Sequence, residues 1–183
     1  IQAAINDAAT VAGNIIEIGT GNFNEQVLVN KSVTLRNKPG AFPVIDFSSM
    51  VTGKPALFDV SADKVTIDSL HFNVDLSKLR SAIIVSGAGI DSITIKDNLI
   101  EPYGTPAGAY GDRNAVSVNY GGPANYRIAT GGVNKIIFDH NTVTVNGVSA
   151  FRSGISADES GGDFTNNTLQ SINQDIIVRF GSN

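Results

Sequence analysis

The sequence of 183 residues contains no cysteine and no tryptophan, and it has one methionine. Without cysteine the chain cannot form a disulfide bond, a thiolate zinc site or a cysteine nucleophile. Only 16% of the residues are charged and the net charge is −4, so no strong positive field indicates nucleic acid or an anionic membrane as a partner. No apolar run approaches the roughly 20 residues of a membrane-spanning helix, so we expect no membrane insertion.

Hydrophobic residues make up 42% of the chain, which is enough for a packed core. The length predicts a single domain over residues 1–183. Glycine, asparagine, serine, threonine and β-branched residues are frequent, and good helix formers are scarce after residue 12. This composition is typical of many short strands joined by tight turns.

An internal repeat organises the sequence. The octapeptide "ITIKDNLI" at 93–100 recurs as "VTIDSLHF" at 65–72, "IIFDHNTV" at 136–143 and "GDFTNNTL" at 162–169. Its first and third positions are mostly apolar, as in a strand, and a bend with asparagine and a second strand follow. A second repeat, exemplified by "RSAIIVS" from residue 80, supplies another strand per copy. With the inserted loops left out, the period is roughly 21 to 28 residues, which predicts a β-solenoid with two or three strands per coil.

Two segments interrupt the period. Residues 101–113 and 119–133 are rich in glycine, proline and tyrosine and are predicted to be loops inserted into a coil. Residues 1–12 have apolar positions at helical spacing and are predicted to form an amphipathic helix that covers the first coil. The last residues stop inside a predicted strand, so we expect a further domain or a partner to cover that end.

The opening of the chain resembles a known group of folds. "IQAAINDAA" is followed by "GNIIEIGTGNFNEQVLVNKSVTLR" at 13–36, in which Gly21, Phe23 and Glu25 form a Gly-x-Tyr-x-Glu-like motif with phenylalanine for tyrosine. This stretch resembles the first coil of the pectin-lyase-like superfamily, which includes pectate lyases, mannuronan epimerases and pectin methylesterases. The resemblance implies an all-β, right-handed parallel β-helix, here of about 5–7 coils, with a short N-terminal amphipathic cap helix.

Equivalent positions of successive coils lie about one strand spacing apart, so the repeat alignment maps the surface. One column contains Asn98, Asn141 and Asn167, whose amides are predicted to form a ladder at the bend. On the outer face of the same strand, Lys96 is predicted to bridge Asp68 and Asp139. His140 beside this column could be an acid or base, but an ordinary exposed histidine is the alternative. His71 has no carboxylate neighbour in its own row and is predicted to be inert.

Another column contains one arginine from each of three successive repeats. Nearby carboxylates could neutralise this row, or the row could bind the carboxylates or sulfates of an acidic polysaccharide. A small residue two positions after each arginine would let a flat sugar approach, and loop tyrosines could stack on its rings. The predicted binding residues are Arg80, Arg113, Arg152, Asn119, Asp158, Tyr110, Tyr120 and Tyr126, above the small residues Ala82, Ala115 and Gly154.

The resemblance to polysaccharide lyases implies specific roles. Arg113 or Arg152 would be the catalytic base, and Asp158, Glu159 and Asp175 would hold a calcium ion beside a uronate carboxylate. The chain would then be a secreted or cell-surface protein that binds an acidic glycan and cleaves it by β-elimination or epimerises it. The alternative is a non-catalytic β-helix module of a larger surface or secreted protein, serving glycan binding, adhesion or spacing. Both readings share one fold, so the fold cannot decide between them.

Overall fold

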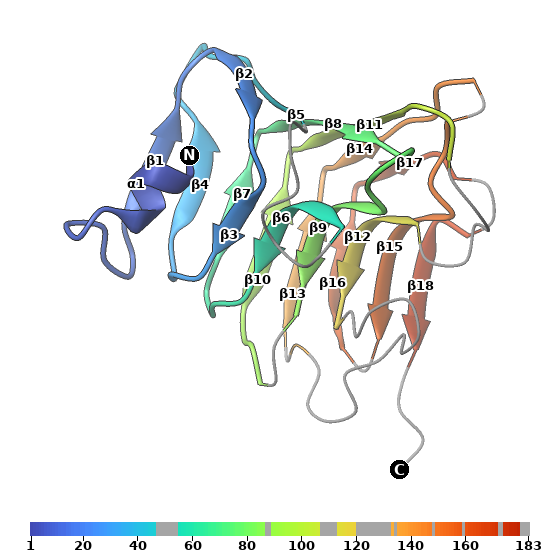
Figure 1. The fold of residues 1–183 in the computed structure, drawn as a ribbon. Coiled ribbons are helices and arrows are strands. Elements are labelled where there is room, and N and C mark those ends of the chain that lie inside the picture. The colour runs from blue at the N-terminus through green and yellow to red at the C-terminus, as the bar shows by residue number, and fades with distance from the viewer. Residues whose placement is uncertain are drawn as a thin grey trace.

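The fold is a parallel β-helix (Figure 1). The computed structural model describes residues 1–46, 55–86, 89–106, 113–119, 133, 135–147, 149–158, 160–171 and 174–179. Within these residues the chain forms one helix and three parallel sheets of six strands each. Each coil gives one strand to each sheet, and the next coil adds its strands in the same order. The predicted all-β solenoid is therefore confirmed, with six coils in the described part of the chain.

We name the sheets A, B and C in the order in which each coil visits them. Sheet A contains β1 (Ile15–Ile18), β4 (Thr34–Asn37), β7 (Thr66–Asp68), β10 (Ile93–Lys96), β13 (Ile136–Asp139) and β16 (Gly162–Thr165). Sheet B contains β2 (Gly21–Asn24), β5 (Pro43–Asp46), β8 (His71–Asp75), β11 (Leu99–Tyr103), β14 (Thr142–Val143) and β17 (Thr168–Leu169). Sheet C contains β3 (Val27–Val29), β6 (Ala56–Val60), β9 (Ser81–Val85), β12 (Asn114–Val118), β15 (Ser153–Asp158) and β18 (Ile176–Arg179).

Apolar side chains stack in register inside the coils. In sheet A, Ile95 pairs with Ile67 in the coil before it and with Phe138 in the coil after it, and all three are fully buried. The rings of Phe58 and Phe72 meet edge to face between sheets C and B, with centroids 5.0 Å apart and planes at 87°. Burying one such side chain stabilises the fold by about 1.5–3 kcal/mol, so the stacked interior holds the coils together. The octapeptide alignment predicted this register correctly.

The corner between sheets A and B has the same two-residue form in coils 3 to 6. Its first residue has a left-handed backbone, with φ between 52° and 57° at Ser69, Asp97, His140 and Asn166. The residue that follows it, an asparagine in coils 4 to 6, is not left-handed. Asparagine, aspartate and histidine tolerate left-handed angles better than most other side chains.

The second corner residue forms the predicted asparagine ladder. Asn141 Oδ1 accepts the backbone N–H of Asn98 at 3.1 Å, and Asn98 Oδ1 accepts that of Leu70 at 3.0 Å. Asn98 Nδ2 donates in turn to the carbonyl of Ile67 at 3.1 Å. Asn98 and Asn141 are only 2% and 0% exposed. These amides satisfy main-chain groups that the bend takes out of the sheet, as a buried backbone requires.

Helix α1 (Gln2–Asn6) covers the first coil but is shorter than the predicted 1–12. The helix stops because the Asp7 side chain accepts the N–H of Ala9 at 2.8 Å, which starts a turn. Ile5 is fully buried in the core. The Gln2 amide accepts the N–H of Leu28 and donates to its carbonyl, at 2.6 and 3.2 Å. Gln2 therefore occupies the open edge of sheet C as another strand would.

The predicted loop at 101–113 begins too early. Strand β11 continues to Tyr103, and Pro102 pairs in register with Val74. Proline in a sequence favours a loop, but Pro102 is buried within a strand. Residues 107–112 and 120–132 of the two predicted loops lie outside the described residues. The expected cover beyond the last coil stays a prediction.

The ladder gives a stability prediction. Replacing Asn141 with alanine should lower the free energy of unfolding by about 2–3 kcal/mol, because the buried Asn98 N–H then loses its acceptor. Urea unfolding followed by circular dichroism measures this, since the chain has no tryptophan. Thr94→Ala, on the outer side of β10, is a control that should change stability by less than about 0.5 kcal/mol. An equally small effect for Asn141→Ala would contradict a structural role for the ladder.

Candidate functional site

The arginine row lies where each coil enters sheet C. Ile83, Val116 and Ile155 are register partners, which places Arg80, Arg113 and Arg152 on successive coils. The N–H of Arg152 donates to the carbonyl of Arg113 at 2.6 Å. The predicted alignment of the three arginines is therefore confirmed at the level of the backbone.

The surroundings of this row differ from the predicted open groove. Arg113 is 1% exposed, whereas Arg80 and Arg152 are half-buried. Ala82 and Ala115 belong to the hydrophobic core with no exposed surface, so the prediction of a sugar-facing shelf is wrong at these residues. Both residues lie within strands, β9 and β12, in which all five residues are buried, so their surroundings are crowded.

Gly154 illustrates the same crowding. A Cβ atom on Gly154 would lie 2.9 Å from both the Asp175 carbonyl oxygen and Leu169 Cδ2. Real Cβ atoms essentially never come that close to a backbone atom. Gly154 therefore allows two coils to approach, and its small size has a packing reason rather than a binding one.

A buried polar network, which the sequence reasoning missed, crosses three coils next to this row. Ser81 Oγ and Ser117 Oγ lie 3.0 Å apart, and Asn114 Nδ2 donates to Ser117 Oγ at 3.1 Å. Ser153 Oγ donates to Asn114 Oδ1 at 2.5 Å. All four side chains are at most 7% exposed. The recurring serine or asparagine after each arginine was the signal that could have revealed this network.

The other predicted site residues that the structure describes, Asn119, Asp158 and Asp175, do not all lie in one place. Asn119 and Asp158 are register neighbours at one end of sheet C, at 1% and 5% exposure. Asp175 is exposed at the other end, where its carboxylate accepts from Ser171 Oγ at 2.9 Å. The carbonyl oxygen of Asp175 accepts the N–H of Gly154. Gly154 precedes Asp158 by four residues in β15, so about 13 Å of strand separates Asp158 from Asp175.

The remaining predicted residues are Tyr110, Tyr120, Tyr126 and Glu159, all of which lie outside the described residues. Among the described residues, no group of three histidine, aspartate or glutamate side chains is arranged to hold a metal ion. The structure thus does not bring Asp158 and Asp175 together, and a calcium site stays a prediction.

Burial of Arg113 predicts a role in stability. Arg113→Met should lower the free energy of unfolding by about 2 kcal/mol or more, because it removes a packed, buried side chain together with the interaction that this side chain makes. Arg152→Met, at the half-buried equivalent position, should cost less than about 1 kcal/mol. Both values come from urea unfolding. Equal losses for the two variants would contradict the assigned difference in burial.

The outer face of sheet A carries a column of alternating charge. Register places Glu17, Arg36 and Asp68 on successive coils, followed by Lys96 and Asp139. Arg36 pairs with Glu17 at 2.7 Å. These partly exposed pairs contribute little stability each, and their alternation favours the correct register.

Lys96 does not bridge Asp68 and Asp139 as predicted. Its ammonium lies 3.1 Å from Asp68 and 3.5 Å from Asp97, and the hydrogen bond to Asp68 is the main reason that its pKa is raised. Asp139 instead accepts hydrogen bonds from Thr165 and Asn166 at 2.6 and 3.0 Å. Asp97, in the left-handed corner position next to Lys96, thus takes the place that was predicted for Asp139.

Hydrogen bonds lower the pKa of Asp139 from 3.8 to about 2. The hydrogen bond from Thr165 has the largest effect, followed by the one with His140 Nδ1, which lies 2.8 Å away. The pKa is lower in the folded state, so this interaction stabilises the fold above pH 4 and is lost as the pH falls through about 2. Thr165→Val should raise the pKa of Asp139 toward 3.8, measured by NMR titration of its carboxyl carbon. An unchanged pKa would contradict the assignment to Thr165.

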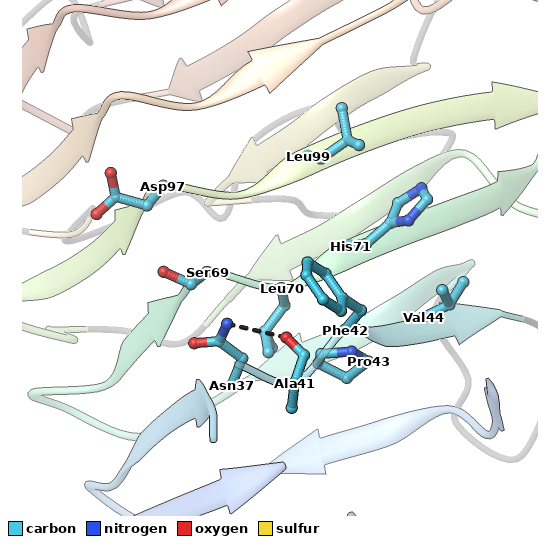
Figure 2. A pocket seen from close by; sticks show the side chains of 10 residues that line it. All are labelled: Asn37, Ala41, Phe42, Pro43, Val44, Ser69, Leu70, His71, Asp97 and Leu99. Atoms are coloured by element: carbon cyan, nitrogen blue, oxygen red, sulfur yellow. Dashed lines mark hydrogen bonds between the residues drawn. The ribbon is translucent and has the colours of Figure 1, made fainter. Parts of the chain in front are cut away.

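A pocket of about 270 Å³ lies at the corner between sheets A and B. Coil 2 turns this corner with five residues, 38–42, whereas coils 3 to 6 use two. The longer corner projects over the start of sheet B and forms one wall of the pocket. Figure 2 shows Phe42 in the middle of the lining residues. They are Asn37, Ala41, Phe42, Pro43, Val44, Ser69, Leu70, His71, Asp97 and Leu99.

Hydrogen bonds fix the long corner. The N–H of Phe42 donates to Thr20 Oγ1 at 3.1 Å, and the N–H of Ala41 donates to the carbonyl of Lys38 at 2.8 Å. Asn37 Nδ2 donates to the carbonyl of Ala41 at 3.3 Å, as the dashed line in Figure 2 marks. The Phe42 residue is nevertheless 78% exposed. The hydrogen bonds of the corner backbone thus hold the apolar ring of Phe42 at the surface.

The outer face of sheet B continues from the pocket as a polar surface. His71 Nε2 lies 2.7 Å from Glu101 Oε2, although not along the line of a hydrogen bond. Glu101 is the register partner of Asn73, so this carboxylate comes from a different row than the one in which no carboxylate was predicted beside His71. Asp46 accepts from the Tyr103 hydroxyl at 2.8 Å and from Asn73 Nδ2 at 3.3 Å. Burial and the bond to Asp46 raise the pKa of Tyr103. His71 therefore belongs both to the pocket and to this surface.

The comparisons with known proteins give one relationship. A stretch of 68 residues, 37% of the chain, is 38% identical to part of a cell surface glycoprotein of Methanothermus fervidus, and the match spans 11% of that protein's length. No protein-family model matches the chain, and no solved structure matches it. Among the described residues, no helix has the length and hydrophobicity needed to cross a membrane.

Proposed function

We propose that this chain is a non-catalytic β-helix module of a larger cell-surface protein. The observation that carries this proposal is the similarity of 68 residues to a small part of a cell surface glycoprotein. A stack of coils suits such a position, because each coil contacts only its neighbours and the stack can be lengthened without a new fold. This is the second of the two readings that the sequence left open.

The geometry supports a role as a rigid spacer. Six coils at one strand spacing extend over roughly 25 Å along the stack. The interior is filled with buried apolar side chains, and the asparagine ladder joins coils 3 to 6 at one corner. Adjacent coils therefore cannot rotate against each other without breaking main-chain hydrogen bonds.

Surface exposure is the test. Antibodies raised against the recombinant chain should label intact cells of the source organism, and brief protease treatment of intact cells should release peptides from it. A cytoplasmic protein probed in parallel controls for lysis. Labelling that requires permeabilised cells would contradict the surface proposal.

Binding of an acidic polysaccharide is a second candidate function. It is favoured by the register that puts Arg80, Arg113 and Arg152 on adjacent coils, together with the first-coil resemblance to the pectin-lyase-like superfamily. Burial of Arg113 leaves Arg80 and Arg152 as the arginines that a glycan could contact directly. Cleavage would require Arg152 to act as the base, since Arg113, the other predicted base, is buried, and calcium would be the ion.

Two measurements separate these candidates. Absorbance near 235 nm, with pectate or alginate and with or without calcium, would rise if the chain were a lyase, and the module proposal predicts no change.

Arg152→Ala should weaken binding of pectate if sheet C is the acidic-glycan surface, with Lys38→Ala as a charge-matched control on the coil 2 corner. Turnover that Arg152→Ala abolishes would overturn the non-catalytic proposal.

A further inference from the structure

We propose that the pocket at the coil 2 corner binds a neutral sugar residue, with Phe42 as the stacking platform. This goes beyond a role as a surface module, because it assigns a ligand class and a site. The site is separate from the arginine row, since it lies at the corner between sheets A and B. Its volume of about 270 Å³ is just below the roughly 300–1,000 Å³ of pockets for drug-sized ligands, so one sugar ring fits.

The platform is the exposed ring of Phe42. Four other phenylalanines of the chain, Phe58, Phe72, Phe138 and Phe151, have no exposed surface, whereas Phe42 is 78% exposed. The apolar C–H face of a pyranose can cover such a ring, which removes apolar surface from water. Pro43 and Val44 extend the apolar floor beside it.

Polar groups stand at the rim where sugar hydroxyls would lie. Ser69 Oγ donates to Asp68 at 2.7 Å, so its lone pairs can still accept a hydrogen bond. The Asp97 carboxylate, with a side chain 46% exposed, can accept from hydroxyl groups. Figure 2 shows Ser69 and Asp97 on one side of Phe42 and His71 on the other. The set offers an apolar face flanked by hydrogen-bonding groups, as amphipathic sugar rings require.

The charges near the pocket favour a neutral ligand. Among the residues that line the pocket, Asp97 carries a carboxylate 3.5 Å from the Lys96 ammonium, and His71 lies 2.7 Å from the Glu101 carboxylate. A uronate carboxylate placed here would meet Asp97 or Glu101 and be repelled. Hydroxyl groups carry no such penalty. The chemistry of this corner therefore differs from that proposed for the arginine row.

The site is held in shape before any ligand arrives. Ser69 and Asp97 occupy the left-handed position of successive corners, and the Asn98 amide fixes the backbone between them. Phe42 is tied to Thr20 in the coil before it. Groups positioned in this way lose little conformational freedom on binding, which favours recognition of a small ligand.

NMR titration of the ¹⁵N-labelled chain tests the proposal. The probes are methyl glucopyranoside, methyl galactopyranoside, methyl mannopyranoside and N-acetylglucosamine, with glucuronate as the anionic counterpart and indole as an apolar one. At least one neutral sugar should shift the amide signals of residues 37–44, 69–71 and 97–99, and glucuronate should shift them less. Phe42→Ala should weaken the apparent affinity about tenfold, and Phe42→Trp should retain it.

Matched variants isolate the two parts of the site. Val11→Ala removes an exposed apolar side chain, 57% exposed, outside the pocket and should leave binding unchanged. Asp97→Gly and Asn166→Gly change the same corner position in coils 4 and 6, where glycine accepts the left-handed backbone, and only Asp97→Gly should weaken binding. No shift with any neutral sugar would overturn the proposal. Stronger shifts with glucuronate or with indole, or shifts confined to sheet C, would overturn it equally.

Discussion

The register between successive coils is the constraint on which the rest of this structure depends. It places apolar side chains such as Ile67, Ile95 and Phe138 above one another, and the corner asparagines then tie each coil to the next through main-chain hydrogen bonds. A slip of one residue would turn every core side chain outward and would separate Asn98 from Asn141. The surface columns follow from the same register, because whatever lies at one position of the repeat recurs about one strand spacing away.

The regular repeats form a scaffold, and the proposed binding pocket lies where a coil departs from the repeat pattern. The corner of coil 2 has five residues in place of two, and these residues carry Phe42 to the surface beside His71 and Asp97. The neighbouring face of sheet B adds polar side chains that contact one another, such as His71 with Glu101 and Tyr103 with Asp46. On the two proposals made above, the A–B corner of coil 2 is the place on a rigid surface module where a small glycan docks.

The interior could be predicted from the sequence because it follows a local pattern. Period-two alternation identified Ile93 and Ile136 as partners, and the same alignment put Arg113 between its two equivalents. The alignment could not reveal what covers the outside of a coil, so the burial of Arg113 was missed. It also omitted coil 2, whose longer corner breaks the octapeptide pattern, and Phe42 was missed with it. Position along a repeat is encoded locally, whereas exposure depends on segments that are distant in the sequence.

The central proposal is that a sugar binds at the five-residue A–B corner of coil 2 and not on the regular faces of the coils. A crystal structure of the chain soaked with the neutral methyl pyranoside of highest affinity tests this most directly. The account predicts a sugar ring stacked on Phe42 with hydroxyl groups toward Ser69 and Asp97. A sugar bound over sheet C beside Arg80 and Arg152, with the coil 2 corner empty, would contradict it.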